Sequence, residues 1–237
     1  MTHQAIALAL SPLLLVQAVV VRRRALILPE AGGPRQGRSG QGQTVRVLVL
    51  GDSSAAGVGV TDQSDALSGQ IVKRLALHRH ISWQVIARTG ATTATTLARL
   101  YAEPPAAMDV VVTALGVNDV TKGAPLTRWL DQQRRLWDML IARGARRILV
   151  SGLPPMGAFP VLPQPLRWVL GRRAAMFDNA LRNAILDCPH TRHIPMDFAP
   201  TDRTLMAADG FHPGPDLYAQ WAERVAGAIL ADTAGAT

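Results

Sequence analysis

Short apolar runs alternate with longer helical patterns along most of this chain, and no other feature restricts the fold as strongly. From Val45 onward, five runs have the length and composition of buried strands, and each precedes a stretch with the apolar spacing of a helix. The candidate strands are Val45–Leu50, Trp83–Ala87, Val110–Leu115, Arg147–Ser151 and His193–Met196. The candidate helices are Ser64–Leu77, Thr93–Tyr101, Leu126–Arg143, Trp168–Leu186 and Pro215–Leu230.

The order strand–helix–strand predicts βαβ units, which build a parallel sheet with helices on both faces. Val110–Val112 are continuously apolar, as expected for a parallel strand that is buried on both sides. A chain of 237 residues, 48% of them apolar, is long enough for one such domain with a sizeable core. We therefore predict an α/β fold, a flavodoxin-like three-layer α/β/α sandwich with a five-stranded parallel sheet.

Polar residues follow three of the predicted strands, at the edge where ligands of such sheets bind. Gly51-Asp52-Ser53 follows the first strand, Gly90 the second and Asn118 the third. Asp209 and His212 stand three residues apart in a turn before the last helix. Because the carboxyl ends of parallel strands meet at one edge, we expect these residues to share a site.

These residue types suit acyl transfer. A serine hydroxyl needs a base within hydrogen-bond reach, histidine is a suitable base near neutral pH, and a carboxylate orients the histidine. A glycine backbone N–H or an asparagine amide can stabilise the oxyanion that forms. Alone, each residue has an ordinary alternative: Ser53 and Asn118 as helix caps, Gly90 as a turn glycine, and Asp209 with His212 as a polar turn. Their order and positions together favour a serine hydrolase.

At this level of detail the chain resembles the SGNH/GDSL hydrolase family of esterases and lipases over about Val45–Leu230. The matching blocks are Gly51-Asp52-Ser53, Gly90 within Thr89–Thr93, Gly116-Val117-Asn118-Asp119 and Asp209-Gly210-Phe211-His212. Two departures are Ser54, where leucine is commonest, and the Arg88-Thr89 lead-in to Gly90. The resemblance implies Ser53 as nucleophile, His212 as base and Asp209 as its orienting acid. It also implies an oxyanion hole made by Gly90, Asn118 and the Ser53 amide, with no metal or organic cofactor.

Other site classes fit less well. Gly57 and Gly59 lack the third glycine of a dinucleotide loop, because residue 62 is Asp62, and no Gly-Lys-Ser/Thr motif of a P-loop occurs. Cys188, His190 and His193 lie close in sequence but match no standard zinc spacing. No basic stripe with base-reading side chains is present, so nucleic acid is not an expected partner.

The proline-rich stretch from Gly152 to Trp168 follows the fourth predicted strand, on the edge that carries the site. A long apolar loop of this kind either forms a wall of a binding pocket or packs on the domain or on the N-terminal segment. From this region and the last motif, Met156, Phe159 and Phe211 are the candidate substrate-binding residues.

The N-terminal part differs in composition from the rest. Residues 1–28 hold an apolar segment, Ala5–Val21, followed at once by Arg22-Arg23-Arg24, and residues 29–44 are rich in Gly, Gln, Ser and Arg. This pattern predicts a membrane anchor and a flexible linker before a hydrolase domain at 45–237, and we expect both to be dispensable for folding. The arginines favour a cytoplasmic catalytic domain. The alternatives are a helix that lies in the membrane interface or packs on the domain, and a soluble cytoplasmic or periplasmic protein.

The predicted function is hydrolysis of carboxylic esters through an acyl-enzyme, on small or medium acyl esters or lysophospholipid-like lipids. Alternatives on the same residues are a thioesterase and a carbohydrate O-deacetylase. A catalytically silent, membrane-anchored binding module is the alternative from another class.

Overall fold

One sheet of six strands forms the centre of the computed structural model, which describes residues 10–198 and 202–234. The strands are β1 (Gln36–Ser39), β2 (Thr44–Gly51), β3 (His80–Ala87), β4 (Val110–Ala114), β5 (Arg147–Ser151) and β6 (Thr191–Ile194), in the spatial order β1-β3-β2-β4-β5-β6. Strands β2 to β6 are parallel, and β1 runs antiparallel to β3 at the edge. The predicted five-stranded parallel sheet of flavodoxin-like order is confirmed, with one antiparallel strand added.

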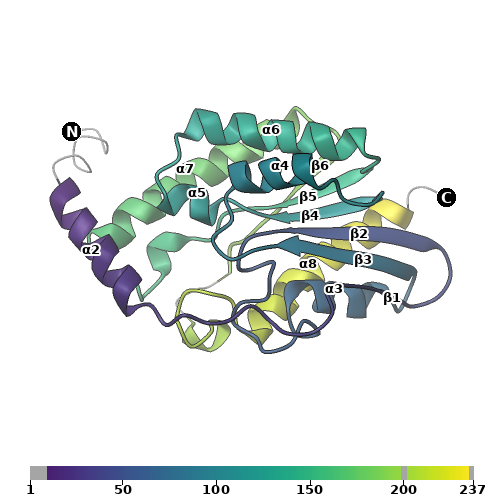
Figure 1. Ribbon diagram of the computed structural model, residues 1–237, viewed down its shortest axis with the longest axis horizontal. Coiled ribbons are helices and arrows are strands. Elements are labelled where there is room, and N and C mark those ends of the chain that lie inside the picture. The colour runs from purple at the N-terminus through teal and green to yellow at the C-terminus, as the bar shows by residue number, and fades with distance from the viewer. Residues whose placement is uncertain (1–9, 199–201, 235–237) are drawn as a thin grey trace.

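Helices cover both faces of the sheet, as Figure 1 shows. On one face lie α4 (Thr93–Ala102), α6 (Leu126–Ala142) and α7 (Leu166–Leu186), and on the other α3 (Leu67–Leu75) packs against α8 (Pro215–Ala234). The short helix α5 (Val117–Thr121) follows β4 and contacts α7, and 3-10 turns occur at Met156–Ala158 and Arg203–Leu205. The three predicted layers are therefore present.

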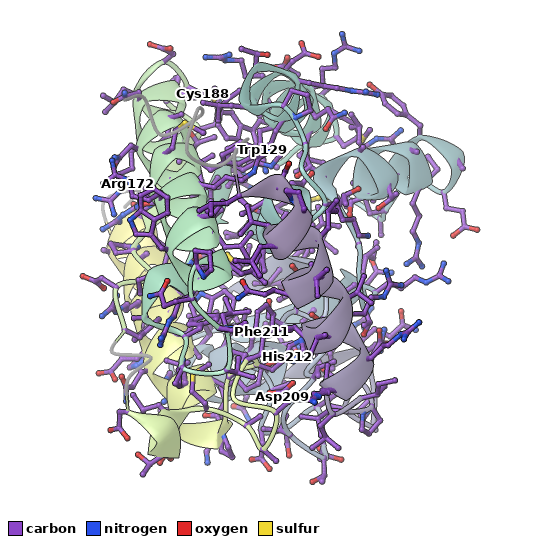
Figure 2. All side chains as sticks on the ribbon, turned by 90° about the vertical axis from the view of Figure 1, so that its left-hand side faces the viewer. Trp129, Arg172, Cys188, Asp209, Phe211 and His212 are labelled. Atoms are coloured by element: carbon purple, nitrogen blue, oxygen red, sulfur yellow. The ribbon has the colours of Figure 1, made fainter. Side chains whose placement is uncertain are left out.

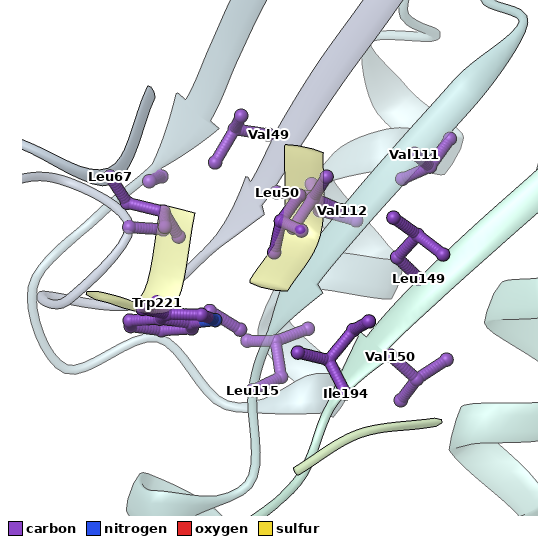
Figure 3. Close-up of a cluster of buried hydrophobic side chains, with 14 of the residues drawn as sticks. Val49, Leu50, Leu67, Val111, Val112, Leu115, Leu149, Val150, Ile194 and Trp221 are labelled. Carbon is purple, nitrogen blue, oxygen red and sulfur yellow. The ribbon is translucent and has the colours of Figure 1, made fainter. Parts of the chain in front are cut away.

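The core lies between these layers. All five residues of β4 are buried, because this central strand is covered by helices on both sides. Figure 3 shows strand side chains such as Leu50, Val112 and Leu149 in one buried cluster with Leu67 from α3 and Trp221 from α8. Burial of this apolar surface stabilises the position of each strand. The loops that carry the polar residues begin at the strand ends, so their starting points are set by the same packing.

Residues 29–44 are built into the domain, so the prediction of a flexible linker is wrong. β1 pairs with β3 over its full length, and the carbonyl of Arg35 accepts a hydrogen bond of 2.7 Å from the N–H of Val85. Ala31 is buried, and Glu30 accepts hydrogen bonds from the N–H and hydroxyl of Thr89. The edge of β3 offers unpaired backbone groups, and pairing with them outweighs the flexibility that the composition favours.

The predicted apolar segment begins outside the described residues, and its described part is helix α2 (Ser11–Arg24). Figure 1 shows α2 beside α7, at the end of the molecule opposite β1. Gln17 joins it to the domain, because its side chain donates to the Gln164 carbonyl at 2.7 Å and accepts from the Leu166 N–H at 3.1 Å. No helix among the described residues has both the length and the apolar character needed to cross a membrane.

Candidate active site

Ser53, His212 and Asp209 form one hydrogen-bonded chain. Ser53 lies just beyond the carboxyl end of β2, and its Oγ is 2.9 Å from His212 Nε2. His212 Nδ1 is 2.5 Å from Asp209 Oδ2. Since a carboxylate can only accept, this geometry places the ring proton on Nδ1 and leaves Nε2 to accept the serine proton. The three residues predicted from the sequence are thus brought together across 159 positions of the chain.

The acidic member of this group is held in its charged form. The side chain of Asp209 is 6% exposed, and that of His212 is 19% exposed. Burial alone would raise the pKa of Asp209, but hydrogen bonds from the His212 ring and from the N–H groups of His212 and Phe211 outweigh it and lower the pKa. Figure 2 shows Asp209, Phe211 and His212 grouped in the lower half of the view, well away from Cys188 near its top.

Two contacts hold the serine loop, the segment after β2 that contains Ser53, in place. One comes from α8 and the other from the histidine loop, the segment before α8 that contains His212. The Tyr218 hydroxyl, on α8, lies 2.9 Å from the carbonyl of Ser54 and 2.7 Å from that of Val58. Gly59 has φ +109°, and a Cβ there would lie 2.2 Å from the Pro213 carbonyl oxygen. Only glycine permits this approach, because another residue would combine a strained backbone with a clash against main chain.

Asn118 lies against Asp52 rather than in open solvent. Its Nδ2 donates a 3.2 Å hydrogen bond to Asp52 Oδ2, and Asp52 Oδ1 accepts from the N–H and hydroxyl of Ser54. Burial raises the pKa of Asp52, opposed by the Ser54 hydrogen bonds, by His212 and by Asn118. An asparagine amide has two N–H donors, so one remains for a ligand.

The backbone N–H groups of Ser53 and Gly90 are free donors: neither makes a hydrogen bond to any described residue. Gly90 has φ +76°, and its carbonyl oxygen accepts a hydrogen bond of 2.7 Å from Lys122 Nζ. It lines a hollow next to the one that contains Ser53. The structure therefore leaves the predicted glycine donor available but places it at the border of the site.

A buried carboxylate not assigned from the sequence ties these loops together. Asp119 accepts hydrogen bonds from the N–H and hydroxyl of Thr93, the first residue of α4. Trp129 and Gln133 donate in turn to the Thr93 hydroxyl. Burial, opposed by Thr93 and reinforced by the nearby Asp52, raises the pKa of Asp119 to about 6. The Asp119–Thr93 contact therefore connects the start of α4 to α5.

An apolar hollow, partly open to solvent, lies beside Ser53 and His212. Its apolar lining is Ala114, Leu115, Val117, Pro154, Pro155, Phe159, Met196, Phe198, Met206, Phe211, Pro213, Leu217 and Trp221. Phe159 and Phe211, two of the candidate substrate-binding residues, lie on this wall, where their rings make an edge-to-face contact 5.3 Å apart. The prediction for Met156 is wrong: its side chain is fully buried and does not line the hollow, because the first turn after Pro155 directs it into the core.

Several lining residues have no motif that would reveal them. Met196, Phe198 and Met206 lie between β6 and α8, and Leu217 and Trp221 lie on α8. Their only signal in the sequence is apolar character in a stretch that leads to Asp209. They reach the hollow because α8 starts directly after the histidine loop and runs back beneath the sheet.

The two histidines weighed for a metal site have other partners. His193 Nε2 lies 3.0 Å from Asp178 Oδ1, and His190 Nδ1 lies 3.2 Å from the Arg146 carbonyl. Across residues 10–198 and 202–234, no three His, Cys, Asp or Glu side chains are grouped so as to hold a metal ion.

Comparison with known proteins agrees with this architecture. The sequence model of the GDSL-like lipase/acylhydrolase family matches residues 49–220. Among curated proteins, none matches this chain in sequence. Among solved structures, TesA is 26% identical at a TM-score of 0.55, covering 76% of this chain and 95% of its own.

Two further structures share the fold at lower identity. The psychrotrophic esterase EstA from Pseudoalteromonas sp., inhibited by monoethylphosphonate, is 21% identical at a TM-score of 0.60, covering 78% of this chain and 96% of its own. The acetyl xylan esterase AlAXEase is 14% identical at a TM-score of 0.62, covering 78% of this chain and all (100%) of its own.

Proposed function

This chain belongs to the GDSL-like lipase/acylhydrolase family and is a carboxylic ester hydrolase, and we propose that it works through an acyl-enzyme on Ser53. The observation that carries the proposal is the continuous hydrogen-bond chain from Ser53 Oγ through His212 to Asp209. A serine with an imidazole nitrogen at 2.9 Å, in a ring oriented by a buried carboxylate, is an activated nucleophile.

In the first half-reaction, Ser53 Oγ attacks the ester carbonyl carbon while His212 Nε2 takes the serine proton. The tetrahedral intermediate collapses with cleavage of the bond to the alcohol oxygen, and His212 returns the proton to that oxygen. In the second half, a water attacks the acyl-enzyme and gives its proton to His212. Collapse releases the carboxylic acid and restores Ser53. Asp209, charged throughout, stabilises the imidazolium that forms twice.

The negative charge on the intermediate needs donors that are already in place. The free N–H groups of Ser53 and Gly90 and the second N–H of the Asn118 amide are the donors of this proposal. They lie at the ends of β2 and β3 and at the start of α5, around one edge of the sheet. Such groups cost no reorganisation when the charge develops, so they act mainly on kcat.

The apolar hollow supports a hydrocarbon acyl group as the part of the substrate held beside Ser53. Phe159, Phe211 and Trp221 offer apolar contact to a chain of small or medium length, as in simple acyl esters and lysophospholipid-like lipids. An acetyl group of a carbohydrate would leave most of this surface unfilled. A thioester would use the same attack, with a thiol as leaving group.

Active-site labelling and substitution test the proposal. A fluorophosphonate should modify Ser53 and not Ser54, and Ser53→Ala should lower kcat by about 10⁴-fold or more with the fold intact. Ser54→Ala is the matched control, because its hydroxyl contacts Asp52 and not His212; it should still be labelled. Full ester hydrolysis by a folded Ser53→Ala variant would exclude the acyl-enzyme.

We further propose that α2 lies on a membrane surface, with the catalytic domain on the cytoplasmic side. Five of its apolar side chains are exposed: Leu13, Leu15, Val16, Val19 and Val20. Arg22, Arg23 and Arg24 occupy its last turn. Exposed apolar side chains next to arginines suit the boundary between acyl chains and anionic headgroups, and the cytoplasmic leaflet carries the anionic lipids.

A further inference from the structure

Helix α5 carries the proposed oxyanion donor Asn118 but is too short to hold its own position. It spans only Val117–Thr121, and its N-cap is Gly116, which has no side chain to cap it. Isolated helices of this length are unstable in water, because the few hydrogen bonds of a first turn do not offset the conformational entropy lost. The direction of the Asn118 amide therefore depends on the contacts that α5 makes with its neighbours.

Three consecutive residues of α5 each contact a different element. Two of these contacts are described above: Asn118 is tied to the end of β2, and Asp119 to the start of α4. The third comes from α7, which lies beside α5 in Figure 1. Nε of Arg173, on α7, donates a hydrogen bond of 3.2 Å to the carbonyl oxygen of Val120.

The guanidinium of Arg173 bridges two carbonyl groups at the end of α5. Besides the Val120 carbonyl it binds that of Ala124, to which its Nη2 donates. The N–H of Ala124 donates in turn to the Asp119 carbonyl at 2.9 Å, which closes the turn after the helix. The last carbonyl groups of a helix have no partner within it, and a cation there also interacts favourably with the helix dipole. Arg173 therefore fixes the carboxyl end of α5 relative to α7.

The other contacts of Arg173 link it to the same packed group of side chains as Asp119. Its guanidinium lies over the ring of Phe177, 4.9 Å from the ring centre. Phe177 packs on Trp129 with the ring centres 4.7 Å apart, and Trp129 donates to the hydroxyl of Thr93, which binds Asp119. Arg173 and Asp119 thus hold α5 against one common set of neighbours.

The charge of Arg173 is not used in an ion pair within the described parts of the chain. The side chain is half-buried, and burial lowers the pKa of Arg173, although an arginine remains charged at any ordinary pH. The two carbonyl groups and the Phe177 ring are therefore the partners of this cation. A half-buried guanidinium with these partners serves the end of α5.

From these contacts we infer that Arg173 is a positioning residue for the oxyanion donor Asn118. This inference rests on the proposed function and adds a residue of α7 to it. Arg173 does not line the hollow that contains Ser53, so it acts through α5 and not on the reacting atoms. A donor stabilises the oxyanion only when it is held in place before the charge develops, and a small displacement removes much of its effect.

Arg173→Met keeps the apolar part of the side chain and removes both hydrogen bonds to the end of α5. We expect kcat for a soluble ester to fall by about tenfold or more with little change in KM, because the oxyanion forms only in the transition state. Arg173→Lys keeps the charge but lacks the planar fork that bridges two carbonyl groups, so it should recover part of the loss. Arg134→Met is the matched control, because Arg134 is exposed on α6 and takes no part in these contacts; it should keep the wild-type kcat.

A double-mutant cycle with Asn118→Ala separates positioning from a general loss of stability. Once Asn118 is alanine there is no amide to misplace, so the addition of Arg173→Met should lower kcat by less than about twofold. Arg173→Lys is taken through the same cycle, which keeps the test open if the methionine variant folds poorly. Thermal unfolding of each variant sets the temperature of the kinetics well below the lowest midpoint.

The failure of this inference differs from the failure of the proposed function. Losses in kcat that multiply in the double variant, a wild-type kcat in a folded Arg173→Met variant, or a raised KM with kcat unchanged would each overturn the role of Arg173 alone. A wild-type kcat in Asn118→Ala would overturn the oxyanion role proposed for that amide and the inference with it. A wild-type protein that hydrolyses no ester would overturn the proposed function itself.

Discussion

The side-chain amide of Asn118 donates a hydrogen bond of 3.2 Å to Oδ2 of Asp52, the residue before Ser53. This contact holds the amide of α5 at the end of β2 and leaves its second N–H for another acceptor. The hydroxyl of Ser54 holds the other oxygen of Asp52 at 2.8 Å. Asp52 is therefore the link between the serine loop and the proposed oxyanion donor.

Asn118→Ala should lower kcat by about 10²–10³-fold with a smaller change in KM, because the hydrogen bond to the oxyanion strengthens in the transition state. Steady-state kinetics on one soluble ester give both parameters. An unchanged kcat with a raised KM would mean that Asn118 holds the ground-state substrate instead.

Gly59→Ala should reduce both stability and activity. The added Cβ would lie 2.2 Å from the Pro213 carbonyl oxygen at φ +109°, which should cost about 2 kcal/mol or more of unfolding free energy. Because Pro213 follows His212, the same shift should lengthen the Ser53–His212 hydrogen bond and lower kcat.

Gly227→Ala is the control for this substitution, because Gly227 lies within α8 with nothing near its added Cβ. It should stabilise the protein by about 0.5–1 kcal/mol. Equal stability of the two variants in denaturant titrations would contradict the role assigned to Gly59.

Asp209→Asn should lower kcat by about 10⁴-fold, since a neutral amide stabilises the imidazolium less and permits the wrong tautomer. It should also change the pH dependence of stability. The pKa of Asp209 is lowered in the folded state, so its charge stabilises the fold above the ordinary aspartate pKa, and this contribution is lost as pH falls through the lower folded value. Unfolding free energies of the wild type and variant should differ at pH 7 and converge in acid. A gap that persists below the folded value would contradict the charge-based explanation.

A chain that begins at Pro29 should fold and hydrolyse simple esters, because α2 contains no buried residue. It should bind phosphatidylglycerol vesicles more weakly than the full chain does, by about 1 kcal/mol for each of the three arginines removed. Phosphatidylcholine vesicles are the neutral control. Equal vesicle binding by the two chains in sedimentation would contradict a membrane role for α2.

A chain that begins at Thr44 should be much less stable than the one that begins at Pro29. It lacks β1, the buried Ala31 and the contacts of Glu30 with Thr89, and it exposes the edge of β3. Thermal unfolding of the two shortened chains measures the difference. Equal melting temperatures would mean that residues 29–43 add nothing to the stability of the domain, as expected for a linker.

The sequence by itself determined the layered α/β fold and the candidate nucleophile, base and acid. The alternation of apolar runs with helical patterns specifies βαβ units, and the carboxyl ends of parallel strands must share one edge. Ser53 follows β2, and His212 precedes α8, so their meeting follows from topology. Phe159 and Phe211 could be assigned to a pocket wall for the same reason.

Only the tertiary structure decided the contacts that have no local pattern. Gln36–Ser39 became a strand because the edge of β3 offered partners, and Met156 turned into the core while Phe159, three residues later, faces the hollow. Asp52 meets Asn118, and Arg173 of α7 binds the end of α5. Each of these depends on how separate elements pack, and packing directions and long-range partners are set by the whole core rather than by the residues adjacent in sequence.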